Sequence, residues 1–211
     1  NGGFESITEP DEGQKFASPY LRYFPRTVTL GPNEAQTVKI QLIRSGNLDP
    51  GEYRSHIYFR AVPREKPLGE EEEVVSDPSS IAVKLTPIFG ITIPAIIRVG
   101  EPSARVTITD PQLRFENDTI PRLGIVFNRT GDYSVFGDIA VDHISAQGTV
   151  TRVGIANGVA VYTPNTRRRF EFSLINTSGL DLGSGRLLIT FSAPSDVKPE
   201  KYAEAVLPLV R

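Results

Sequence analysis

Cysteine, methionine and tryptophan are all absent from this sequence of 211 residues. Without cysteine, the chain can form no disulfide, no thiolate zinc site and no cysteine nucleophile. The absence does not indicate a compartment, because exported proteins can also lack cysteine. Since the sequence opens at Asn1 and contains no methionine, we expect the gene product to hold residues upstream of it.

The chain also has little excess charge and no long apolar run. Its formal net charge is −2 and its isoelectric point is near 5.8, which gives no electrostatic reason to expect nucleic acid or an anionic membrane as partner. No run of about 18 apolar residues occurs, so the sequence predicts no membrane-spanning helix. A hydrophobic fraction of 39% and a charged fraction of 23% are typical of a folded globular protein.

The periodicity of the apolar residues indicates strands throughout. The stretch Thr37 to Ile43 alternates, with Val38, Ile40 and Leu42 on one face. Similar short segments recur to the end of the chain, separated by turn residues, and the pair Asn157-Gly158 predicts a two-residue hairpin turn. No helix-period segment longer than about two turns occurs. The sequence therefore predicts an all-β protein.

The spacing of these segments predicts two domains, residues 1–99 and 100–211, joined at the hinge-like stretch Arg98 to Ser103. The second half offers enough strands for a complete immunoglobulin-like β-sandwich. The first half offers four or five, so we expect its sandwich to be incomplete at the N-terminus and its apolar face to be open. Its opening strands would then be upstream of Asn1 or removed from the chain.

One segment is unusually long and apolar for a strand. From Ile81 to Ile97 every odd position up to residue 93 is apolar, which gives one continuous face at the two-residue period of a strand. We expect Phe89 to Ile97 to be a core strand of the first sandwich. Ile81, Val83 and Leu85 would project beyond it, beside the solvated acidic loop that includes Glu70 to Glu73. Such an uncovered edge can bind another protein by strand addition, although a strand that is core along its whole length remains the alternative.

Residues that could carry catalysis or bind metal do not form a recognisable pattern. His56 and His143 are in different predicted domains, so neither supplies the convergent ligands of a metal site or a catalytic triad. The run Arg167 to Arg169 could grip a phosphate or a carboxylate. However, only Arg167 and Arg169 would share a side of the strand. The start of a solvent-exposed strand is a simpler interpretation of this run than an anion-binding site. We therefore predict no catalytic residue, no cofactor and no metal.

Three stretches together resemble the periplasmic pilus-assembly (PapD-like) chaperones. FPRTVTLGPNEAQTVKIQL (Phe24 to Leu42) is similar to a strand pair of that family, and LDPGEYRSHIYFRAVP (Leu48 to Pro63) is similar to the strand that follows it. After a loop, IAVKLTPIFGITIPAIIR (Ile81 to Arg98) occupies the place of the family's donor strand. The resemblance covers residues 20–100 well and the second domain only by its general pattern.

The resemblance implies two immunoglobulin-like domains and a non-catalytic chaperone of the periplasm. It would bind an exported pilus or surface-fibre subunit by lending a strand, with Ile81, Val83, Leu85 and Pro87 as the partner-binding residues. No nucleic acid and no membrane insertion are implied, and the same exposed edge allows self-association. The family's lysine position falls on Gly90, so its usual carboxylate anchor is not matched here.

Two other functions stay open from the residues. The first is a structural or adhesive immunoglobulin-like module of the cell envelope, in which the long strand is entirely core. The second is an enzyme that uses carboxylates across the cleft between the two domains, for which the sequence offers no specific pattern.

Overall fold

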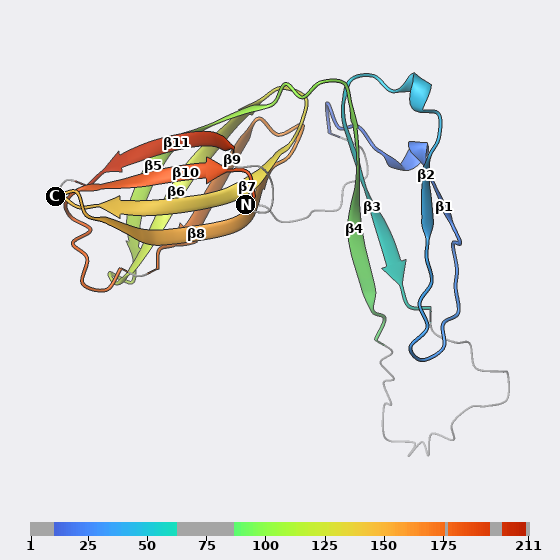
Figure 1. Ribbon diagram of the computed structural model, residues 1–211, viewed down its shortest axis with the longest axis horizontal. Helices are drawn as coiled ribbons and strands as arrows, with labels where there is room; N and C mark the ends of the chain where they lie inside the picture. Colours follow the sequence, from blue (N-terminus) through green and yellow to red (C-terminus); the bar gives the residue numbers. More distant parts are fainter. Residues whose placement is uncertain (1–10, 63–86, 176, 195–199, 210–211) are drawn as a thin grey trace, which may run out of the picture. The chain divides into compact units, whose positions relative to one another are not determined.

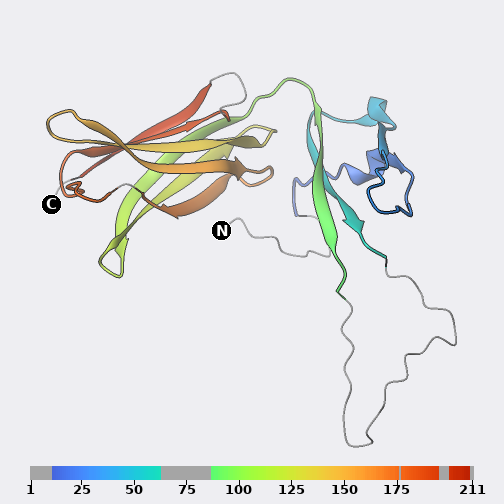
Figure 2. The ribbon, with the colours of Figure 1, turned by 60° about the horizontal axis from the view of Figure 1, so that its bottom comes forward.

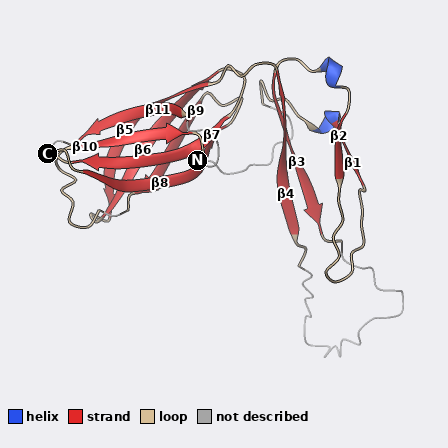
Figure 3. Ribbon diagram, in the orientation of Figure 1, coloured by secondary structure: helices blue, strands red, loops and turns tan. Residues whose placement is uncertain are grey.

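The computed structural model describes residues 11–62, 87–175, 177–194 and 200–209, and these form an all-β protein. All of its sheets are antiparallel in the pairings described. The helical residues in this part of the chain are two single-turn 3-10 helices, Ser18–Tyr20 and Ser45–Asn47 (Figure 3). The predicted all-β class is confirmed.

The described residues group into two compact units. Unit 1 holds residues 11–15, 44–53 and the described residues from Ile97 onward, and unit 2 holds Phe16–Ile43 and the described residues of Arg54–Ile96. Strands β3 (Gly51–Arg60) and β4 (Gly90–Val99) each have residues in both units. The division into residues 1–99 and 100–211 stays a prediction.

Unit 1 contains two sheets (Figure 1). One has the order β5-β6-β9, and the other has the order β11-β10-β7-β8. The bounds of these strands are β5 Arg105–Glu116, β6 Ile120–Thr130, β7 Val135–Ile144, β8 Val150–Val161, β9 Arg167–Ser173, β10 Arg186–Ser192 and β11 Lys201–Pro208.

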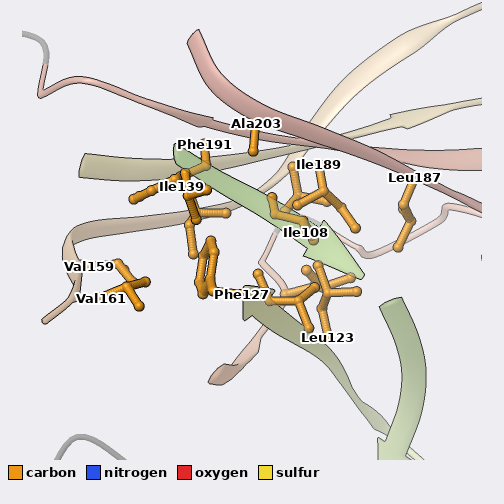
Figure 4. Packing of buried hydrophobic residues seen from close by; sticks show 14 of the residues in the cluster. Ile108, Leu123, Phe127, Ile139, Val159, Val161, Leu187, Ile189, Phe191 and Ala203 are labelled. Carbon is orange, nitrogen blue, oxygen red and sulfur yellow. The ribbon is translucent and has the colours of Figure 1, made fainter. Parts of the chain in front are cut away.

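The inward faces of these two sheets share one hydrophobic core (Figure 4). Alternation along each strand produces it: Leu123 and Phe127 of β6 are fully buried, as are Ile189 and Phe191 of β10. The rings of Phe127 and Phe191 are 4.9 Å apart between centroids, so side chains from the two sheets are in direct contact. Each such buried side chain contributes about 1.5–3 kcal/mol to folding.

Two strands of unit 1 run through residues that usually end a strand. β5 continues through Asp110 and Pro111, which a β-bulge between Thr109 and Gln112 accommodates. β8 runs through Asn157 and Gly158, so the hairpin predicted there is wrong. The pairing with β7 shifts register at this point, and the Gly158 N–H donates to the Asp138 carboxylate (2.8 Å). Cross-strand partners thus override the local turn signal.

Unit 2 contains two separate pairs of strands (Figure 2). β1 (Leu21–Phe24) pairs with β2 (Lys39–Leu42), and β3 pairs with β4. The alternating residues 26–30 do not form a strand. β1 ends before Pro25, because proline has no N–H to donate to a ladder.

Candidate functional site

The candidate site is an apolar groove in unit 2, which we call the unit-2 groove. It has a volume of about 900 Å³ and lies among β1, residues between β1 and β2, β3 and the residues around the start of β4. Its apolar lining includes Tyr23, Val28, Tyr58, Phe89 and Ile91. No aspartate or glutamate lines the groove among the described residues, whereas Arg26 and Arg60 do.

The side chains of this groove are not covered, although their residue types are typical of a protein core. Phe89 is 77% exposed and Ile91 is 68% exposed, and Tyr58 on β3 is 60% exposed. Ala17 is the single described hydrophobic residue of unit 2 that is fully buried. Contiguous apolar surfaces of this kind are found at protein–protein interfaces and in ligand-binding grooves.

The expectation that Phe89 to Ile97 is a core strand is therefore wrong. The strand begins at Gly90 rather than Phe89, and Ile93 is 49% exposed. Phe89 and Ile91 line the open unit-2 groove and are not enclosed by neighbouring side chains. The open apolar face expected for the first half of the chain is present in unit 2.

β4 has a free edge opposite β3, because β3 is its one partner among the described strands. The Ala61 N–H donates to the Phe89 carbonyl (2.8 Å), which directs the main chain of Phe89 toward β3. Successive residues of a strand bond to opposite sides, so the main-chain groups of Gly90, Thr92 and Pro94 face the free edge. Pro94 has no N–H, which leaves Gly90 and Thr92 as the positions able to pair fully with an added strand.

Gly90 lies directly beneath the ring of Tyr58. A Cβ atom at residue 90 would be 2.4 Å from a ring carbon and 2.5 Å from the hydroxyl oxygen of Tyr58. A side chain at this position, such as the lysine of the resembled family, would displace the ring. The Tyr58 ring thus occupies the space that such a side chain needs.

Of the four predicted partner-binding residues, Pro87 alone belongs to the described part of the chain. Ile81, Val83 and Leu85 lie outside the described residues, as does the acidic run from Glu70 to Glu73. Pro87 is described; it is exposed and lies three residues before β4. The groove residues Tyr23 and Tyr58 were missed from the sequence, although the aromatic-rich alternation of β3 is a signal that could have identified Tyr58.

Sequence reasoning also missed a buried polar network in unit 1, where β3 begins. The side chain of Glu52 is fully buried and accepts hydrogen bonds from the N–H and the hydroxyl of Ser134. Arg98 at the end of β4 donates to the same carboxylate (3.1 Å). The ends of β3 and β4 that belong to unit 1 are therefore held there by charge-assisted hydrogen bonds.

Arg129 of β6 is a second buried charged residue of unit 1. Its guanidinium donates to the carbonyls of Asn165, Gly131 and Tyr133 at 2.7–2.9 Å. Burial lowers the pKa of Arg129, because the charged form loses hydration that three neutral carbonyls replace only in part. No ligand-binding geometry results, since these donors are already satisfied by the chain itself.

The histidines have no catalytic or metal-binding arrangement in the part of the chain that the structure describes. His143 is buried, with its Nε2 3.1 Å from the Ser184 carbonyl, whereas His56 is exposed on β3. Within the described ranges, no group of three or more histidine, aspartate or glutamate residues is placed to hold a metal. No helix among these residues has the length and apolar character needed to cross a membrane.

Comparisons with known proteins give little further information. No protein-family model matches the chain, and no curated protein matches it. One similar solved structure is that of DesR, a beta-glucosidase from Streptomyces venezuelae in complex with D-glucose, with a TM-score of 0.33 and 12% sequence identity. The match covers 51% of this chain and 15% of that chain. A likeness this distant carries no argument about fold or activity.

Proposed function

We propose that the chain is a non-catalytic periplasmic chaperone that binds an exported pilus or surface-fibre subunit by lending an edge β-strand. Its two units would then be two immunoglobulin-like sandwiches, residues 1–99 and 100–211, with the first one incomplete. The shared core of the two sheets in unit 1 and the four strands of unit 2 support this arrangement. The single observation that carries the function is the uncovered apolar lining of the unit-2 groove.

The energetics favour a polypeptide partner over a small ligand. Covering four large side chains of the groove contributes about 6–12 kcal/mol, at about 1.5–3 kcal/mol each. Association itself costs about 4–15 kcal/mol. Apolar burial alone therefore only offsets this cost, and main-chain hydrogen bonds along a free strand edge would supply the remainder.

The free edge of β4 restricts where such a strand can pair. Gly90 and Thr92 each offer both an N–H donor and a carbonyl acceptor at this edge. Pro94 offers no N–H, which limits pairing beyond them. An added strand would thus pair along the start of β4, next to Pro87. Ile81, Val83 and Leu85 lie outside the described residues, and their role in binding the partner is part of this proposal.

Photo-crosslinking tests the proposal. Cells would export the chain together with a pilus subunit, with p-benzoylphenylalanine placed at Ile91 in one variant and at Val150 in another. Val150 is a matched control, since it is 61% exposed but lies on β8 of unit 1. We expect the Ile91 variant to crosslink to the subunit and the Val150 variant not to do so.

Charge substitution in the groove is a second test of the proposed function. Ile91→Glu should abolish co-purification of the subunit while the chain stays folded, and Val150→Glu should leave co-purification unchanged. If the subunit co-purifies equally with both variants, strand lending at the unit-2 groove is wrong. A structural or adhesive module would then be the better interpretation.

A further inference from the structure

A charged hollow on the outward face of the β5-β6-β9 sheet is independent of the unit-2 groove. It has a volume of about 200 Å³, and its floor is formed by Gly124 and Val126 of the central strand β6. Arg114 of β5, Arg122 of β6, and Arg169 and Glu171 of β9 surround it. Three neighbouring strands thus contribute to one site in unit 1.

The glycine at the centre of this hollow has no structural requirement. Gly124 does not have the positive φ angle that favours glycine, and a Cβ atom there would meet only the Gln112 carbonyl oxygen, at 3.9 Å. A glycine inside a strand weakens it and often marks a place where a ligand approaches the backbone closely. Here the missing side chain leaves the floor open.

A β-bulge lies at the same level on the neighbouring strand. Gln112 pairs with Gly124 and Thr109 pairs with Val126, so the extra residues of β5 are displaced beside the hollow. Bulges occur often next to functional sites, where they redirect side chains. The bulge places Asp110 at the rim, 3.6 Å from Arg167.

The charges of the hollow are not balanced. Arg122 forms ion pairs with Glu116 and Glu171, each at 2.8 Å, and is thereby neutralised. Arg114 donates to the neutral amide of Gln112 (2.8 Å), and the Arg169 guanidinium has no hydrogen bond or ion pair with any residue that the structure describes. Two guanidinium groups at this hollow therefore lack an acidic partner among the described residues.

We propose that this hollow binds the carboxylate of a small acidic sugar. Guanidinium groups recognise carboxylates with paired, charge-assisted hydrogen bonds, while Gln112, Asp110 and Glu171 offer acceptors for sugar hydroxyls. No aromatic ring of the described residues lines the hollow, so charge rather than stacking would select the ligand. The volume is below the range of about 300–1,000 Å³ of drug-sized pockets, which suits a single sugar unit.

The test is a titration of the isotope-labelled full chain, followed by the amide resonances of Gly124 and Gln112. Glucuronate is the probe. Glucose tests whether the sugar ring alone is bound, inorganic phosphate tests whether any anion is bound, and the dipeptide Ala-Ala tests whether a peptide carboxylate is bound. We expect saturable shifts with glucuronate, and no saturation with the other three at the same concentrations. No saturation with glucuronate, or equal binding of phosphate or the dipeptide, overturns the proposal.

Three variants make the test specific. Arg169→Gln should weaken glucuronate binding by about tenfold, the loss expected for one charge-assisted contact. Arg105→Gln removes the same charge from an exposed position on the same sheet and should change affinity by less than about twofold, since exposed charges at a distance are screened. Gly124→Val should abolish binding while the chain stays folded, as its thermal unfolding would show. Equal losses in Arg169→Gln and Arg105→Gln would mean a general charge effect and would overturn the site.

Discussion

The buried carboxylate of Glu52 accepts hydrogen bonds from both the N–H and the hydroxyl of Ser134, a residue 82 positions later in the chain. The Ser134 hydroxyl in turn accepts a hydrogen bond from the Thr163 N–H (3.0 Å). One side chain at the start of β3 thus joins three distant segments of unit 1. This contact explains why residues 44–53 belong to unit 1 although the strand continues into unit 2.

Removal of the Glu52 carboxylate should destabilise unit 1. Glu52→Ala leaves two buried donors of Ser134 without an acceptor, at a cost of about 1–3 kcal/mol for each. The measurement is urea unfolding followed by the amide resonances of unit 1. Glu204→Ala is the control, because its ion pair with Lys201 is exposed and contributes about 0–1 kcal/mol. Equal losses in the two variants would contradict a buried anchoring role.

Asp132 should make unit 1 sensitive to acid. The hydroxyl of Ser103 donates to the Asp132 carboxylate (2.8 Å), and this bond lowers the pKa of Asp132 below its ordinary value of 3.8. The unfolded chain therefore binds more protons than the folded chain between the two pKa values. The stabilisation is complete above pH 3.8 and is lost as the pH falls through the folded pKa.

The Ser103→Ala variant isolates this contribution. It should raise the pKa of Asp132 toward its ordinary value, as a carbon-detected NMR titration of the carboxylate would show. The stability difference between the variant and the parent chain should be present at neutral pH and disappear in strong acid. A difference that stays constant over the whole range would contradict the assignment.

Gly90 and Tyr58 should behave as a coupled pair. Gly90→Ala places a methyl group where the Tyr58 ring lies, and because the ring is 60% exposed it can move away at a cost below about 1 kcal/mol. We expect large changes in the Tyr58 ring resonances and a small loss of stability. In a Tyr58→Ala background, Gly90→Ala should cost no stability; a persistent loss there would mean that the glycine is needed for another reason.

The core of unit 1 and the groove of unit 2 should respond differently to truncation. Phe127→Ala removes a fully buried ring and should cost about 3–5 kcal/mol. Ile91→Ala removes a side chain that is 68% exposed and should change stability by less than about 0.5 kcal/mol. The amide resonances of each unit have to be followed separately during unfolding, because two units need not unfold in one cooperative transition. A large loss in Ile91→Ala would show that the groove is covered in solution.

Part of the candidate site could be anticipated from the pattern of one strand. The two-residue period of Phe89, Ile91 and Ile93 indicated one apolar face, but these residues were expected in a core and are exposed instead. The pattern could not show that these residues are exposed rather than core, because alternation reports which side chains share a face and not what covers that face. Tyr58 was missed because its role depends on its contact with Gly90, on the neighbouring strand.

By itself, the sequence determined the all-β class, because that class follows from local periodicity and from the lack of helix-period segments. It also showed that Arg167 and Arg169 share one side of a strand. Only the tertiary structure decided that β8 continues through Asn157 and Gly158, that Glu52 reaches Ser134, and that Arg169 meets a hollow over Gly124. These features depend on the register between strands that are distant in the chain, and register is set by cross-strand packing and hydrogen bonding rather than by any one segment.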